Sequence, residues 1–287
     1  MTRRLERFEV FLREIKISHS VFALPFAVAA AFMARERLPE ASLLALIVLA
    51  CVFARTAAMA FNRYCDAEID ARNPRTARRA VPAGRLSRGF MLGATLVSAA
   101  AFVATAYWIN SLAFVLSPLA LLVVLGYSYT KRFTSFSHLV LGAALGLSPV
   151  GAWVAVKERI DVLPVLLGAA VLFWTAGFDV IYACQDRRFD QGEGLFSLPR
   201  RLGISRALSL ARIFHGLTVA LLVAVGWLGG YGLPYAAGVV LVTTLLVYEH
   251  SLVRPGDLSR VNLAFFTLNG LVSVLFMAAV ILQIVLS

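Results

Sequence analysis

Charged residues are scarce in this sequence. Asp, Glu, Lys and Arg make up 15% of its 287 residues, whereas soluble domains carry about 25%. Hydrophobic residues reach 60%, a balance that argues against a soluble domain and predicts an integral membrane protein. The alternating ten-residue segments of a membrane β-barrel are also missing, so we expect an all-α protein.

Cysteine and histidine are rare as well, with three and four copies. Cys51, Cys65 and Cys184 are too scattered for a disulfide framework or a metal cage. The histidines form no HExxH or other paired spacing. Disulfide stapling and zinc chemistry are therefore not expected.

Apolar runs of about 20 residues, the length that crosses the hydrocarbon core of a bilayer, recur along the whole chain. Nine such runs lie at residues 18–34, 41–64, 89–108, 111–129, 138–156, 161–184, 207–228, 234–252 and 261–286. No long polar linker separates them, so we expect a single domain, residues 1–287, with nine transmembrane helices. Residues 1–16 are too long and too acidic for the start of a signal peptide, and we expect an amphipathic interfacial helix there.

Lys and Arg fall mainly on one side of these runs. If the N-terminus is cytoplasmic, the cytoplasmic segments hold 21 of the 27 basic residues, and the opposite side holds four. The positive-inside rule thus predicts a cytoplasmic N-terminus and cytoplasmic loops at 65–88 and 185–206. The net charge of +11 then serves orientation and attraction to anionic headgroups, and we expect no nucleic-acid partner.

The second apolar run leads into a first acidic motif, Asn62, Asp66 and Asp70. Residues four apart share one face of a helix, so the three side chains form a polar stripe that descends toward the cytoplasm. Arg55 lies two turns earlier on the same face. A charge at that depth costs about 2.5–3.5 kcal/mol unless it faces protein or water, which predicts that Arg55 points inward.

The sixth run ends in a second acidic motif, Asp186 and Asp190, with Asp179 two turns above it. These acids follow Asp66 and Asp70 by 120 residues in both cases, and each pair precedes a basic loop that contains proline. The pattern indicates a weak internal repeat. Both motifs fall on the predicted cytoplasmic side. Lys and Arg alone predict that side, so the positions of the acids agree with it independently.

Carboxylates spaced in this way suit Mg²⁺, which proteins usually hold with one or two carboxylates plus substrate phosphates. The neighbouring arginines can bind phosphate oxygens in bidentate fashion. The fourth run adds a third polar end, with Lys131 one turn after Tyr127. Together these features predict a diphosphate site open to a hydrophobic interior, and hence a lipid diphosphate as the ligand.

These residues resemble the UbiA superfamily of intramembrane aromatic prenyltransferases, which carry an NxxxDxxxD motif after the second helix and another Asp-rich motif after the sixth. The segments KISHSVFALPFA, AFNRYCDAEIDARNPRTARR, YSYTKRFTSFSH and DVIYACQDRRFDQGEGLFSLP are similar to the quinone-pathway branch, the 4-hydroxybenzoate or naphthoate polyprenyltransferases. The resemblance covers essentially the whole chain. It implies a nine-helix bundle in the inner membrane, with a central cavity open to the cytoplasmic side and laterally to lipid.

The resemblance also implies roles for single residues. Mg²⁺ held by Asp66, Asp70, Asp186 and Asp190 would bind the diphosphate of a polyprenyl donor. The catalytic residues would be these four together with Arg55 and Asn62, and the remaining substrate-binding residues would be Arg72, Arg75, Tyr127, Lys131, Asp179 and Tyr182. Arg79 is a further candidate for the phosphates, and Asp179 is alternatively a buried partner of Arg55.

The aromatic acceptor implied first is 4-hydroxybenzoate, in the biosynthesis of ubiquinone; 1,4-dihydroxy-6-naphthoate or another naphthoate, leading to menaquinone, is the alternative. A polytopic transporter is a remote rival, because the charges cluster at one membrane face and not at the midplane. A CDP-alcohol phosphotransferase would need a DGxxAR element, which the sequence lacks. Donor length and oligomeric state stay open.

Overall fold

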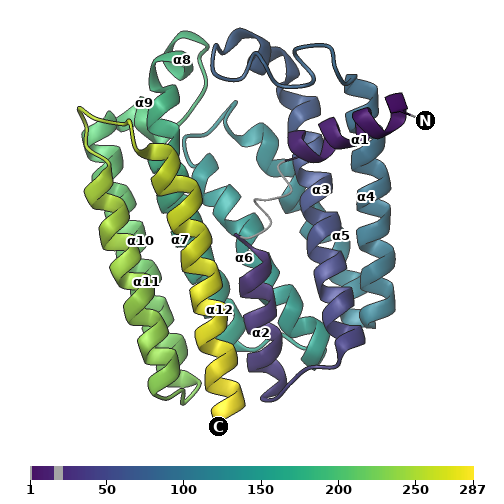
Figure 1. The fold of residues 1–287 in the computed structure, drawn as a ribbon, viewed down its shortest axis with the longest axis vertical. Helices are drawn as coiled ribbons and strands as arrows, with labels where there is room; N and C mark the ends of the chain where they lie inside the picture. Colours follow the sequence, from purple (N-terminus) through teal and green to yellow (C-terminus); the bar gives the residue numbers. More distant parts are fainter. Residues whose placement is uncertain (1, 16–21) are drawn as a thin grey trace.

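Long helices that alternate in direction make up most of the chain in the computed structural model, which describes residues 2–15 and 22–287 (Figure 1). No strand occurs in these two ranges. The all-α prediction is confirmed. The elements are α1 (Thr2–Glu14), α2 (Leu24–Arg35), α3 (Ala41–Arg72), α4 (Arg88–Ile109), α5 (Ser111–Thr130), α6 (Ser137–Lys157), α7 (Val162–Ala183), η2 (Cys184–Asp186), α8 (Arg187–Gly192), α9 (Leu198–Leu202), α10 (Ile204–Leu228), α11 (Leu233–Leu252), η3 (Leu263–Leu268) and α12 (Asn269–Leu286).

Eight helices are long and apolar enough to cross a membrane, counted over the described residues. The predicted count of nine is not confirmed, because α2 has only 12 residues. The run expected at 18–34 begins as a helix at Leu24, and residues 18–21 lie outside the described part of the chain. Residues 1 and 16 of the expected interfacial segment also lie outside it; helix α1 covers Thr2–Glu14.

Helix α3 extends beyond the predicted end at residue 64 and carries the first acidic motif as regular helix. It has 32 residues and is therefore about 48 Å long, more than the ~30 Å of hydrocarbon. No glycine or proline interrupts it. It ends where Asn73 adopts extended backbone angles, as expected for a residue that precedes proline.

Helices α6 and α7 pack with unusually close backbones. A Cβ atom added at Gly142 would lie 2.3 Å from the carbonyl oxygen of Leu172, and one added at Gly146 would lie 2.5 Å from that of Gly168. Small residues allow membrane helices to approach in this way. The α6–α7 pair therefore forms a rigid unit, and it carries the second acidic motif at its end.

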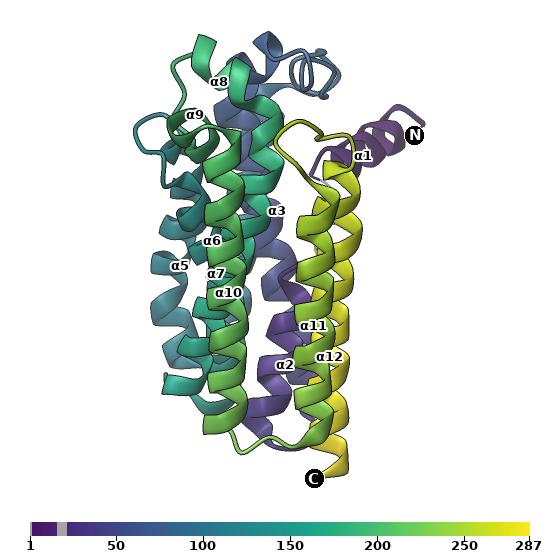
Figure 2. The ribbon, with the colours of Figure 1, turned by 90° about the vertical axis from the view of Figure 1, so that its left-hand side faces the viewer.

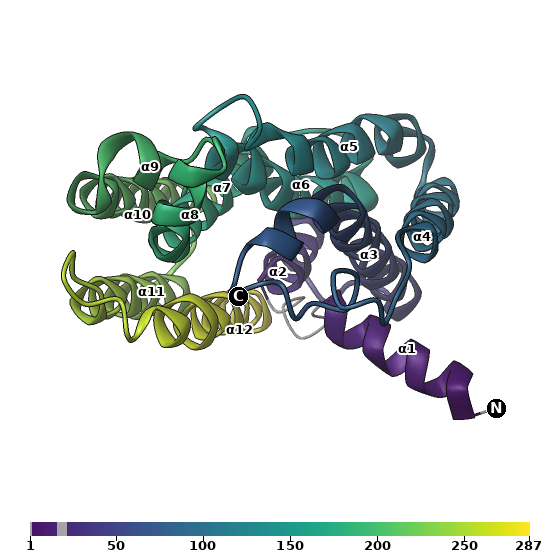
Figure 3. The same cartoon turned by 90° about the horizontal axis from the view of Figure 1, so that it is seen from above.

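The polar connections gather at one end of the bundle. The segment after α3 and the short helices α8 and α9 lie together there (Figure 2), and α1 lies at the rim of the bundle at the same end (Figure 3). Trp108 and Trp227 close α4 and α10 at the other end, with 72% and 81% of their surface exposed. Exposed tryptophans are typical of the membrane interface.

Candidate active site

The first acidic motif forms a hydrogen-bonded stripe on α3. Asn62 donates from Nδ2 to Asp66 Oδ2 at 2.9 Å. Asp66 and Asp70 are buried, with 2% and 5% of their surface exposed. Helical spacing predicted this alignment, and the structure places all three residues on one continuous helix.

Asp66 meets the polar end of α5. Lys131 Nζ lies 2.6 Å from Asp66 Oδ2, and Arg132 Nη2 lies 3.6 Å from Oδ1. Within the described part of the chain, Asp66 Oδ1 accepts no hydrogen bond. An ionised buried carboxylate requires compensation, so this oxygen is available to a further cation.

Asp70 is held by the loop that follows α3. Arg79 Nη1 donates to both carboxylate oxygens, at 2.8 and 2.7 Å, and Thr76 Oγ1 donates to the backbone oxygen of Asp70. On the other side, Arg63 Nη1 lies 3.8 Å from Asp70 Oδ2. Two arginines thus flank one carboxylate.

Arg75, in the loop after the first acidic motif, binds the second motif, which lies more than 100 residues later in the sequence. Its Nε donates to Asp186 Oδ1 at 2.9 Å, and its Nη1 donates to the hydroxyl of Tyr182 at 3.0 Å. Asn73 Nδ2 donates to the same Asp186 oxygen at 3.2 Å. Burial lowers the pKa of Arg75, but the hydrogen bond and the charge of Asp186 outweigh it and raise this pKa above its usual range.

A second bridge between the motifs is the ion pair of Arg72 and Glu193, at 2.7 Å. Asp190 accepts a hydrogen bond from Ser197 Oγ at 2.7 Å and lies close enough to Asp186 and Lys131 to interact with both electrostatically. The ends of α3, α5 and α7 therefore meet in one polar region, as the sequence predicted.

Asp179 has a partner that the sequence did not indicate. His138 of α6 is buried, and its Nδ1 lies 2.7 Å from Asp179 Oδ2. The amide of Leu198 donates to His138 Nε2 at 3.4 Å, so that a neutral ring carries its proton on Nδ1 and donates it to Asp179. His138 and Asp179 are 41 residues apart and lie on different helices, so helical spacing in the sequence could not predict this contact.

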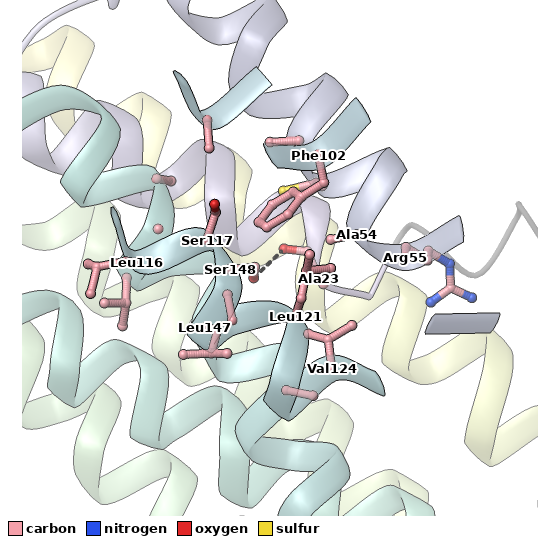
Figure 4. A pocket seen from close by; sticks show the side chains of 18 of the residues that line it. Ala23, Ala54, Arg55, Phe102, Leu116, Ser117, Leu121, Val124, Leu147 and Ser148 are labelled. Carbon is pink, nitrogen blue, oxygen red and sulfur yellow. Dashed lines mark hydrogen bonds between the residues drawn. The ribbon is translucent and has the colours of Figure 1, made fainter. Parts of the chain in front are cut away.

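An apolar cavity of ≈ 330 Å³ lies beside this polar region, between α3, α4, α5 and α6. Arg55 and Tyr127 contribute to its wall, as does Ser117 midway along α5. Figure 4 shows these surroundings, with Ala54 next to Arg55 on α3 and Phe102 on α4. The lining of the cavity is almost wholly apolar, which suits contact with a hydrocarbon chain.

Three of the four predicted metal ligands are paired with basic side chains in this structure. Among the described residues, no three His, Cys, Asp or Glu side chains lie close enough together to hold a metal ion. Instead, Lys131, Arg79 and Arg75 neutralise the carboxylates of Asp66, Asp70 and Asp186. The donor set of hard carboxylate oxygens fits Mg²⁺, and Asp66 Oδ1 lacks a hydrogen-bond donor within the described ranges.

Three comparisons with known proteins bear on this site. The sequence profile described as the UbiA prenyltransferase family matches residues 23–278. A 4-hydroxybenzoate octaprenyltransferase of Yersinia pseudotuberculosis is 30% identical over 252 residues, which are 88% of this chain and 87% of that protein. The apo structure of a UbiA homolog from Aeropyrum pernix K1 aligns with a TM-score of 0.84 at 34% identity, over 93% of this chain and 98% of the other.

A third relative is more distant in sequence. A UbiA homolog from Archaeoglobus fulgidus bound to GPP and Mg²⁺ aligns with a TM-score of 0.77 at 21% identity, over 96% of this chain and 99% of the other. At that identity the likeness concerns the fold.

Proposed function

The chain belongs to the UbiA prenyltransferase family, and on this premise we propose that it transfers a polyprenyl chain from a polyprenyl diphosphate to 4-hydroxybenzoate in a Mg²⁺-dependent reaction. Membership makes it a polyprenyltransferase and a multi-pass membrane protein. The donor, the acceptor, the metal and the roles of single residues belong to the proposal.

The observation that carries the proposal is the meeting of the two acidic motifs beside an apolar cavity. Arg75, from the loop after the first motif, binds Asp186 of the second, and Lys131 contacts Asp66. Arg55 and Tyr127 line the cavity; Arg55 is on α3, which also carries Asp66, and Tyr127 is on α5, which Lys131 directly follows. A polar head and a long hydrocarbon tail would be accommodated side by side, which matches a polyprenyl diphosphate.

The cations of the site are positioned to bind the diphosphate. Lys131, Arg75 and Arg79 each pair with a carboxylate, and arginine also binds phosphate oxygens in bidentate fashion. Arg72, now paired with Glu193, is the fourth cation at the same opening. Together they would neutralise the charge that builds up on the departing pyrophosphate.

Asp66, Asp70, Asp186 and Asp190 are the residues that would hold Mg²⁺. The metal, when bound, supplies a Lewis acid that stabilises the leaving pyrophosphate. The Archaeoglobus fulgidus homolog bound to GPP and Mg²⁺ supports the use of a divalent metal.

In the reaction, the bond between the allylic carbon of the donor and the diphosphate oxygen breaks, and a bond from that carbon to the aromatic ring forms. The ring then loses a proton. Arg55 and Asn62 lie deeper than Asp66, where the ring would be placed, and Arg55 would pair with its carboxylate. The helices around the cavity would keep water from the allylic cation.

The Yersinia relative, a 4-hydroxybenzoate octaprenyltransferase, supports 4-hydroxybenzoate as the acceptor. A naphthoate such as 1,4-dihydroxy-6-naphthoate is the competing acceptor, because a carboxylate on either ring suits Arg55. We further propose that the site faces the cytoplasm from the inner membrane, which the distribution of Lys and Arg supports.

The test is a transfer assay with membranes that contain the protein. Polyprenyl diphosphate and Mg²⁺ are supplied with 4-hydroxybenzoate or 1,4-dihydroxy-6-naphthoate, and prenylated products are detected by mass spectrometry. We expect product with 4-hydroxybenzoate and its loss when EDTA removes the metal. If only the naphthoate gives product, the naphthoate is the acceptor. If no aromatic acid gives product, the proposal is refuted.

A further inference from the structure

We propose that Glu14, at the end of the N-terminal helix, is a positioning residue: it draws Arg63 toward itself, holds the ion pair of Arg63 with Asp70 at 3.8 Å, and so limits the competition of Arg63 with the metal-diphosphate complex for this carboxylate. The inference rests on the proposed function. It assigns a role to α1, whose sequence predicted only a helix at the membrane interface.

Helix α1 is docked on the bundle beside the first acidic motif. Phe11 and Ile15 are buried against Ala60 of α3 and Met91 of α4. The rings of Phe11 and Phe90 lie 5.5 Å apart in an edge-on arrangement. Figure 3, the view from above, shows α1 at the rim of the bundle beside α3 and α4, with its N-terminal end pointing away from the other helices. The docking fixes the position of Glu14.

Glu14 uses both carboxylate oxygens at this contact. Its Oε1 lies 3.1 Å from Arg63 Nε, and its Oε2 accepts a hydrogen bond of 2.8 Å from the amide of Ala80. The side chains of Glu14 and Arg63 are 10% and 4% exposed. One acidic group from α1 therefore holds both α3 and the loop that carries Arg79.

Arg63 lies between the carboxylates of Glu14 and Asp70 and interacts with both. Its Nε forms an ion pair with Glu14 Oε1 at 3.1 Å, without the geometry of a hydrogen bond, while its Nη1 donates to Asn62 Oδ1 at 2.9 Å and lies 3.8 Å from Asp70 Oδ2. Asp70 is already paired with Arg79. The formal charges of the two acids, Glu14 and Asp70, and of the two arginines, Arg63 and Arg79, sum to zero.

Removal of the Glu14 charge would break this balance. Arg63 is too buried for water to compensate it, and an unpaired buried charge is costly. Asp70 is the nearest remaining carboxylate, so Arg63 would close on it and compete with the metal. Glu14 therefore acts on the site through Arg63, without touching the substrate.

The first test is the Mg²⁺ dependence of prenyl transfer. Glu14→Gln keeps the shape but removes the charge, and we expect the Mg²⁺ concentration for half-maximal activity to rise about 10- to 100-fold, as for other partners of metal ligands. Turnover at saturating Mg²⁺ should change less. The matched control is Glu9→Gln, which removes an exposed acid from the same helix and should leave the Mg²⁺ dependence unchanged.

A double variant separates positioning from simple loss of structure. Glu14→Gln with Arg63→Gln restores the charge balance, so the Mg²⁺ dependence should return toward the wild-type value. A purely structural role for Glu14 predicts the opposite, since the double variant would lose more contacts than the single one. Failure of the second substitution to rescue the first overturns the inference.

A second readout needs no transfer activity. Mg²⁺ with inorganic pyrophosphate should raise the thermal unfolding midpoint of the purified protein, and Glu14→Gln should need more Mg²⁺ for the same rise. If Glu14→Gln does not fold, Glu14→Asp is used instead, because it retains the charge on a shorter side chain. We expect it to raise the required Mg²⁺ concentration by less than Glu14→Gln would. Equal Mg²⁺ dependence in wild type and folded variant overturns the inference, whereas a difference without any prenylated product overturns only the proposed function.

Discussion

Asn269 donates a hydrogen bond from Nδ2 to Glu249 Oε1 at 3.1 Å, and neither side chain is exposed at all. The same amide donates to the backbone oxygens of Ala264 and Phe265 at the π-helical turn η3, and its Oδ1 accepts from Trp174 Nε1. This polar cluster ties α7 and α11 to the start of α12.

We expect Asn269→Ala to destabilise the protein by about 1–3 kcal/mol, because the indole N–H of Trp174 would be left without a partner in an apolar interior. Thermal unfolding in detergent measures the effect. The control, Thr244→Val, removes only a bond to a carbonyl one turn earlier on a lipid-exposed helix face. Equal midpoints for the two variants would contradict the prediction.

The acidic motifs give the second prediction. Asp66→Ala and Asp186→Ala should each abolish prenyl transfer while the protein still inserts into membranes, because each removes a proposed metal ligand. Product formation and the membrane-bound amount are measured together. Asp257→Ala changes an exposed acid in the loop after α11 and should keep near wild-type activity; wild-type rates in both site variants would rule out the metal assignment.

Arg75 gives the third prediction. Arg75→Lys should raise the KM for the polyprenyl diphosphate roughly tenfold, because lysine cannot reproduce the planar contacts to Asp186 and Tyr182. Steady-state kinetics with varied donor measure the change. The neighbouring exposed Arg78→Lys is the control, and an equal KM in both variants would argue against a role of Arg75 in donor binding.

The cavity gives the fourth prediction. Ala54→Phe would fill space beside Arg55, so turnover should fall more with long polyprenyl donors than with geranyl diphosphate. A series of donors of increasing length, assayed side by side, measures this. Leu122→Phe is the control, since Leu122 is 69% exposed on the outer side of α5. A uniform loss across all donor lengths would show that the cavity does not hold the chain.

Sequence reasoning predicted the parts of the site that lie on one element or repeat along the chain. Asn62, Asp66 and Asp70 follow helical spacing, and Asp186 with Asp190 repeats it after 120 residues. The structure brings both motifs together. The extent of the helices was less predictable, because apolar length alone marks neither the continuation of α3 to Arg72 nor the start of α2 at Leu24.

Contacts between different helices could not be predicted from helical spacing or from a repeat in the sequence. Glu14 with Arg63, and His138 with Asp179, join residues 49 and 41 positions apart, and only the packing of the helices brings them together. Arg63 lies directly next to Asn62 in the sequence, but it is off the helical spacing of the acidic stripe, and its burial is visible only in the structure.

The glycine contacts between α6 and α7 have a consequence for the second acidic motif. Asp179, Tyr182 and Asp186 stand on or directly after α7, and His138 stands on α6. With backbones in direct contact at Gly146 and Gly168, a single added methyl group in the middle of the membrane would wedge the two helices apart. The alignment of the carboxylates of Asp179 and Asp186 thus depends on the absence of side chains about three to five helical turns below them.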